Sequence, residues 1–146
     1  MTLTKCGRPF RLLRPRNARK VYSASPHEAE MKFDRFSFGS ILIDDKSYEH
    51  DVIIDRGEIL KRKKKPSKQF QDQFGHTPLS IEECIPWKCR RLIIGTGAHG
   101  RLPVMEEVKR EARRRRVELL ILPTAEAIKR LGQDAADTNA ILHVTC

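Results

Sequence analysis

Long apolar runs are missing from this chain of 146 residues, whose uninterrupted apolar stretches span only a few residues each. A helix that crosses a bilayer needs about 20 consecutive apolar residues, so the sequence predicts no membrane span. Hydrophobic residues make up 39% of the chain and charged residues 33%, which is typical of a small globular domain. The net charge of +10 permits acidic partners but says nothing about the fold.

Cysteines and catalytic motifs are scarce as well. Cys6, Cys84, Cys89 and Cys146 are too scattered for a disulfide framework, and a chain of this length can hold a core without one. We therefore expect reduced thiols and a cytoplasmic protein. Cys84 and Cys89 lack the spacing of a zinc site and no second ligand pair accompanies them, so we predict no metal. A G-x-S-x-G motif is also missing, and we predict no catalytic residue and no cofactor.

Acidic residues are rare at the start of the chain, where residues 1–30 contain seven Lys or Arg and two Glu. Three prolines and the lack of an apolar period predict a disordered basic leader, followed by a single α/β domain over residues 31–146. Three interpretations of the leader stay open. Translation starts at Met31, or the leader is a transit peptide that places the protein in mitochondria, or it is a solvated basic tail.

Short apolar runs separated by turn residues begin at Phe36. Residues 36–44 and 48–55 are predicted to form an N-terminal β-hairpin, and residues 58–65 an edge strand whose five consecutive cations stay exposed. The polar residues 69–75 predict a loop. Ser80 is predicted to open a short helix, with Glu83 completing a capping box and Pro86 ending the helix.

The second half of the chain has the pattern of an α/β unit. An apolar strand that begins at Arg91 leads into a glycine loop, a helix follows over residues 103–115, and another apolar strand covers residues 117–122. This order predicts parallel pairing through a right-handed crossover. A further helix is expected to begin with Thr124 as its cap and to end at Gly132, before a last strand over residues 140–146.

The glycine loop matches a nucleotide-binding pattern, because Gly95, Gly97 and Gly100 form G-x-G-x-x-G. The context argues against a dinucleotide. Arg101 and Leu102 separate the loop from the next helix, and no acidic residue ends the following strand to hold a ribose. On this interpretation the glycines serve a tight turn with positive φ angles.

A weaker binding function remains for this loop, because open α/β sheets bind ligands at the carboxyl ends of their strands. The candidate pocket for a small anion consists of Gly95, Thr96, Gly97, His99, Arg101 and Thr124. His76 and His143 are candidates to extend the pocket. A histidine inside a strand, as His143 is predicted to be, is more often a hydrogen-bonded structural residue.

Two cationic runs, residues 61–65 with Lys68 and residues 113–116, favour a nucleic-acid partner. Neither run contains an aromatic residue on which a base could stack. The second run also lies in the last turn of a predicted helix, where cations are favoured whatever the function. We therefore predict at most salt-dependent binding without sequence preference.

Five short motifs carry a resemblance to known proteins. They are Phe38-Gly39-x-Ile41, His76-x-x-Leu79-Ser80, Ile93-Ile94-Gly95-Thr96-Gly97, Thr124-x-x-Ala127 and Leu142-His143-x-Thr145-Cys146. In this order the sequence resembles, over about residues 33–146, the small α/β domain shared by the adipogenesis-associated domain-containing protein, the mitochondrial complex I assembly factor three and many uncharacterised bacterial and archaeal proteins.

The resemblance implies a three-layer α/β fold in which helices cover a mixed, mostly parallel sheet of five to six strands. It also implies that no enzymatic activity is established. Together with the missing catalytic motifs, it favours a non-enzymatic module for protein interaction or assembly, with an unidentified protein partner. The alternatives are the small-anion pocket at residues 95–101 and nonspecific nucleic-acid binding.

Overall fold

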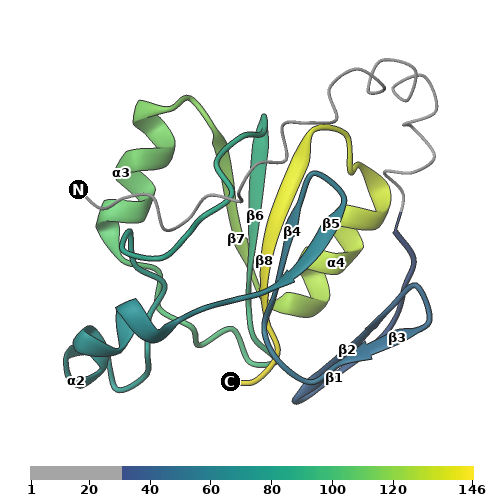
Figure 1. Ribbon diagram of the computed structural model, residues 1–146, viewed down its shortest axis with the longest axis horizontal. Helices are drawn as coiled ribbons and strands as arrows, with labels where there is room; N and C mark the ends of the chain where they lie inside the picture. The colour runs from purple at the N-terminus through teal and green to yellow at the C-terminus, as the bar shows by residue number, and fades with distance from the viewer. Residues whose placement is uncertain (1–30) are drawn as a thin grey trace, which may run out of the picture.

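The computed structural model describes residues 31–146, and the predictions for residues 1–30 lie outside the described residues. Its centre is a five-stranded sheet with the strand order β5-β4-β8-β6-β7 (Figure 1). The strands are β4 (Val52–Asp55), β5 (Glu58–Lys61), β6 (Arg91–Thr96), β7 (Glu118–Leu122) and β8 (Thr138–His143). β6 pairs parallel with β7 and β8, whereas β4 pairs antiparallel with β5 and β8. The mixed α/β sheet confirms the predicted fold class.

The two faces of this sheet pack against different helices, because successive residues of a strand point to opposite faces. One face packs against α4 (Thr124–Gln133), with a core that includes Ile93, Ala140, Leu142, Ala127 and Leu131. The other face packs against α3 (Glu106–Arg114), with a core that includes Leu92, Ile94, Ile141, Val108 and Ala112. The sheet therefore lies between two helical layers, as Figure 1 shows.

A second, antiparallel sheet is formed by β1 (Phe33–Ser37), β2 (Ser40–Ile43) and β3 (Lys46–Tyr48), and Ile41 and Ile43 join it to the α4-side core. The predicted strand 36–44 is divided into β1 and β2, because Gly39 adopts a φ of +91° and turns the chain. The predicted strand 48–55 is divided too. β3 ends at Tyr48, and β4 belongs to the main sheet. The N-terminal hairpin is thus present as β2 and β3, with shorter strands than predicted.

The segment before β6 differs most from its prediction. No helix begins at Ser80, because Glu83 points inward to Arg62 instead of capping, and the Ser80 hydroxyl bonds Ser67. The predicted loop at 69–75 contains a short helix, α2 (Gln71–Phe74), which follows the 3-10 helix η3 (Lys65–Phe70). β5 ends at Lys61, four residues before the predicted end of that strand.

The two main helices also begin differently than predicted. α3 begins at Glu106 and not at residue 103, because Leu79 pairs with residues 103–105: its N–H donates to Pro103 O (2.8 Å) and its carbonyl accepts from Met105 N (3.0 Å). α4 has Pro123 as its N-cap residue, and Thr124 is the first helical residue, with its side chain turned into the core. No helix within residues 31–146 is long and apolar enough to cross a membrane.

Candidate functional site

The predicted site residues converge at one edge of the main sheet. β6 and β8 run parallel, and Thr96 pairs with His143 where both strands end. The loop 97–101, the start of α4 and the segment 143–146 meet here. We call these residues, together with the β1–β2 turn at Phe38 and Gly39, the glycine-loop edge.

Thr124 holds this edge together. Its side-chain oxygen Oγ1 donates to the carbonyl oxygen of His143 (2.7 Å) and accepts from the N–H of Gly97 (2.8 Å). A Cβ atom on Gly95 would lie 2.8 Å from the same oxygen. Gly95 is therefore needed so that α4 can approach β6 closely, and Thr124 is a buried crosslink between three chain segments.

The loop N–H groups are engaged by the chain itself. Ala98 N donates to Thr145 O (3.1 Å), His99 N to Cys146 O (2.8 Å) and Gly100 N to Gly97 O (3.2 Å). Gly97 has a φ of +105°, and a Cβ atom there would collide with the backbone oxygen of Thr145. The positive φ angles expected for the loop are thus present at Gly97 and Gly100.

The remaining predicted residues lie at the same edge. Thr96 Oγ1 donates to Leu122 O (3.0 Å), while His99 and Arg101 are exposed. The His99 ring lies 6.2 Å from the ring of Phe38. His76 reaches this edge as well, because its Nδ1 atom is 3.6 Å from the thiol of Cys146. The small-anion pocket stays a prediction.

A buried ion network joins this edge to the rest of the fold, and sequence reasoning missed it. It consists of Asp51, Arg62, Glu83 and His143. The guanidinium of Arg62 donates to Asp51 Oδ2 (2.8 Å), to both oxygens of Glu83 (2.8 Å each) and to Pro78 O (3.1 Å). The Arg62 side chain is 0% exposed, so both carboxylates compensate a fully buried charge.

Asp51 links the network to β8. Its Oδ2 atom lies 2.7 Å from Nδ1 of His143, and its Oδ1 atom accepts from the N–H of Val144 (3.0 Å). Burial raises the pKa of Asp51, but the hydrogen bond and charge of His143, the Val144 N–H and the charge of Arg62 outweigh burial and lower the pKa from 3.8 to about 2. Burial lowers the pKa of Arg62, but the hydrogen bonds and charges of Glu83 and Asp51 outweigh burial and raise the pKa above its ordinary value.

Asp51, His143 and Thr145 form a chain of close contacts that resembles the acid–base–hydroxyl arrangement of nucleophilic catalysis. His143 Nε2 lies 3.3 Å from Thr145 Oγ1, so carboxylate, imidazole and hydroxyl follow one another. Such chemistry also needs free N–H donors for an oxyanion. Each N–H of the loop 97–100 already has a partner within residues 31–146. These contacts explain how the imidazole of His143 is held in place, but they do not by themselves assign a reaction to the protein.

The spacing of the cysteines and histidines predicted no metal site. Within residues 31–146, no group of three or more His, Cys, Asp or Glu is placed to hold an ion. Cys89 and Cys146 are free thiols, whereas Cys84 is disulfide-bonded. The expectation of four reduced cysteines is therefore wrong at Cys84.

The chain belongs to a family of proteins of unknown function, DUF498/DUF598, which matches residues 33–141. Among solved structures, the conserved hypothetical protein PH1505 from Pyrococcus horikoshii OT3 is 30% identical with a TM-score of 0.66, over 80% of this chain and 100% of that one. A structure named MT938 is 25% identical with a TM-score of 0.58, over 80% and 100% of the two chains.

A third structure shares the fold alone. This Bordetella pertussis protein, described as a Mth938-like domain, is 15% identical with a TM-score of 0.53, over 80% of this chain and 87% of that one. No curated protein matches the chain. Because the family is one of unknown function, membership assigns no activity to this protein.

Proposed function

We propose that the protein is a non-enzymatic, assembly-type module that binds a protein partner at the glycine-loop edge. The observation that carries the proposal is Phe38, whose side chain is 63% exposed, the largest value among the exposed large apolar residues of the described chain. Aromatic side chains are enriched in protein interfaces, where a few of them supply most of the binding energy. A single exposed apolar residue is common, so its setting must carry the argument.

Phe38 is held in place by the main domain. The next residue, Gly39, donates its N–H to the carbonyl oxygen of Val144 (2.7 Å), and the Phe38 ring lies beside His99. The β1–β2 turn is thereby tied to the end of β8 and to the glycine loop. An anchor that is ordered before binding loses less conformational freedom on association, which favours affinity.

The charge of the surroundings indicates the kind of partner. Arg101 is exposed and forms no ion pair with any residue of the range 31–146, and the whole chain has a net charge of +10. A fitting partner presents an apolar pocket for Phe38 with carboxylates around it. The resemblance to the mitochondrial complex I assembly factor three supports an assembly role.

A site-specific crosslinking experiment tests the proposal. A photo-reactive phenylalanine analogue is placed at position 38 in cells of the source organism, and at Lys88, an exposed residue at the opposite end of β6, as the control. We expect one discrete crosslinked protein from position 38 and none from position 88. Its yield should fall when Arg101→Glu is added. Equal patterns from both positions, or no crosslink at 38, contradict the proposal.

The small-anion pocket remains a second candidate, because exposed His99 and Arg101 flank the loop. The N–H groups of Ala98 and His99 could face an anion only if residues 145 and 146 leave them. A chain that ends at Val144 should then bind inorganic phosphate, and the full chain should not. Absence of phosphate binding by both chains, measured calorimetrically, contradicts this candidate.

Nucleic-acid binding is a third candidate, and the lysines of the segment 61–68 favour it. Lys63, Lys64, Lys65 and Lys68 are exposed and form no ion pair with another residue of 31–146, whereas Arg114 and Arg115 are both paired with Glu111. Phosphate contacts by these lysines would make affinity fall steeply with salt concentration. An affinity that does not change with salt excludes this candidate.

A further inference from the structure

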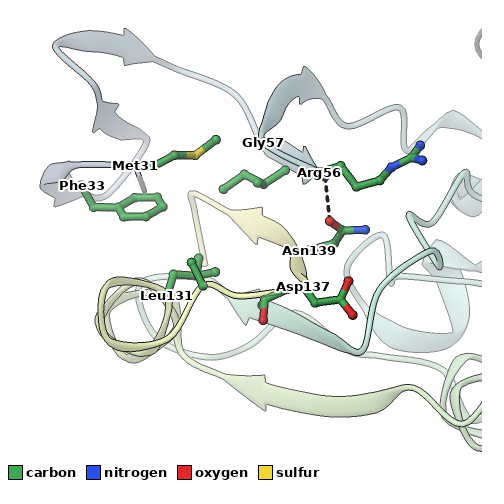
Figure 2. A pocket seen from close by; sticks show the side chains of 10 residues that line it. Met31, Phe33, Arg56, Gly57, Leu131, Asp137 and Asn139 are labelled. Atoms are coloured by element: carbon green, nitrogen blue, oxygen red, sulfur yellow. Dashed lines mark hydrogen bonds between the residues drawn. The ribbon is translucent and has the colours of Figure 1, made fainter. Parts of the chain in front are cut away.

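A cavity of about 350 Å³ lies at the edge of the main sheet opposite the glycine loop (Figure 2). The turn between β4 and β5, the start of β8, the end of α4 and the start of β1 surround it. Small-molecule pockets in proteins begin at about 300 Å³. The cavity is therefore large enough for a small organic ligand, and none of the residues that line it belongs to the site described above.

The lining is divided by polarity. Figure 2 shows Met31, Phe33 and Leu131 on one side, and Arg56, Asp137 and Asn139 on the other. The apolar residues come from different layers of the fold, since Phe33 is in β1 and Leu131 in α4. A ligand that fits must have an apolar body and a polar end.

The side chain of Asn139 holds the backbone of the β4–β5 turn, on the polar side of the cavity, in place without a ligand. Asn139 is 1% exposed. Its side-chain oxygen accepts from the N–H of Arg56 (2.8 Å, the dashed line in Figure 2), and its amide nitrogen donates to Pro86 O (3.0 Å). The turn at Arg56 is thereby tied to β8. A site whose walls are already in place binds without the entropic cost of ordering them.

The charged residues at the rim of the cavity determine which charge the polar end of a ligand should carry. The guanidinium of Arg56 is paired with Asp55, at 3.0 Å between Nε and Oδ1. Asp137 is exposed, and its backbone oxygen accepts from the N–H groups of Arg90 and Arg91. Its carboxylate makes no hydrogen bond or ion pair with any residue of the range 31–146. Of the two charged residues that line the cavity, Arg56 is thus paired, and Asp137 carries a carboxylate without a charged partner among residues 31–146.

We propose that this cavity binds a small primary amine with an apolar body. The ammonium group pairs with the carboxylate of Asp137, and the body lies against Phe33 and Leu131. A charged hydrogen bond supplies orientation, and the apolar wall supplies burial. This site is separate from the partner surface at the glycine-loop edge, and its test does not depend on that surface.

An NMR titration of the full, ¹⁵N-labelled chain tests the proposal, with 2-phenylethylamine and n-hexylamine as probes and phenylacetate as the anionic control. We expect saturable amide shifts from the two amines, centred on residues 135–139 and 56–57, and none from phenylacetate. Saturable binding of phenylacetate in place of the amines overturns the proposal, because Arg56 would then set the charge. No saturable shift from either amine overturns it as well.

Two variants and a control complete the test. Asp137→Asn removes the charge, and it keeps the fold because Asn tolerates the φ of +51° at this position. We expect it to weaken amine binding about tenfold. Ala135→Trp fills the cavity and should abolish binding. Asp45→Asn, an exposed residue in the β2–β3 turn with a similar φ of +66°, should leave the affinity unchanged. An unchanged affinity in Asp137→Asn overturns the proposal.

Discussion

Arg62 shows how one residue in a run of similar residues can differ from the others. Its side chain is buried, whereas Lys61, Lys63, Lys64 and Lys65 are exposed. The sequence predicted five exposed cations because the acid that pairs with Arg62, Glu83, is 21 residues away and no local pattern connects the two. The one usable signal is the arginine itself, since a guanidinium matches two carboxylates better than an ammonium does.

Arg62→Ala should destabilise the protein strongly. The substitution leaves the carboxylates of Asp51 and Glu83 buried without their cation, and removal of one partner from a buried ion pair costs about 3–5 kcal/mol. Urea denaturation measures the loss. Lys63→Ala, at the exposed neighbour, is the control and should change the free energy of unfolding by less than about 0.5 kcal/mol. Similar losses in the two variants would contradict the role given to Arg62.

Asp51 should make stability depend on acid. Its pKa is about 2 in the folded protein and 3.8 in an ordinary aspartate. Below pH 3.8 the unfolded chain takes up the proton first, so the stabilisation is complete above that pH and is lost as the pH falls towards 2. The loss amounts to about 2 kcal/mol.

The comparison of Asp51→Asn with the native chain isolates this effect. The free energy of unfolding of the variant should vary less between about pH 4 and about pH 2, whatever its absolute value. Asp45→Asn, at an exposed turn, should keep the native slope. If the native chain and Asp51→Asn lose stability in parallel over this range, Asp51 does not have the lowered pKa.

At the scale of elements, local patterns predicted most of the second half of the chain. The strands β6 and β7, the helix α4 and the glycine loop are close to their predicted places, because apolar period and turn residues act within a few positions. The predicted helix at Ser80 failed because Glu83 is bound by Arg62 from another element. The predicted start of α3 was wrong because the backbone of Leu79 pairs with residues 103–105. Both errors have a tertiary cause.

Gly97→Ala should destabilise the loop after β6. The residue has a φ of +105°, and its new Cβ atom would collide with the backbone oxygen of Thr145. Backbone strain and the collision together should lower the free energy of unfolding by about 2 kcal/mol or more.

Gly132→Ala is the matched substitution within α4. A Cβ atom at Gly132 meets nothing within 4 Å, and alanine is favoured over glycine in a helix by about 1 kcal/mol. We expect this variant to be more stable than the native chain in thermal denaturation. If both alanine variants shift stability in the same direction, the backbone of the glycine loop is not constrained as described.

At the scale of the whole molecule, the two sheets could not be separated from the sequence. The predicted strand 48–55 spans the passage from the small sheet to the main sheet, because Tyr48 ends β3 and residues 52–55 form β4. Only residues 49–51 lie between β3 and β4. The separation depends on pairing with β8, at the far end of the chain, which no local pattern reports.

The two sheets should differ in hydrogen exchange. β1 and β3 contain no buried residue, whereas every residue of β6 and β8 is buried. Segments with few buried contacts open at lower free energy than the core does. Exchange measured by NMR on the native chain should therefore show β6 and β8 protected far longer than β1 and β3. Equal protection of both sheets would mean that they open together.

The buried pairing of Arg62 also determines the alignment of β5, the edge strand of the main sheet. The N–H of Arg62 continues the ladder to the carbonyl oxygen of Asp51 (3.0 Å), while its side chain enters the network behind. A shift of one residue would turn every side chain of β5 to the opposite face and would place a lysine in the slot that fits a guanidinium. The four lysines of this run are exposed and do not fix the register of β5, whereas Arg62 does.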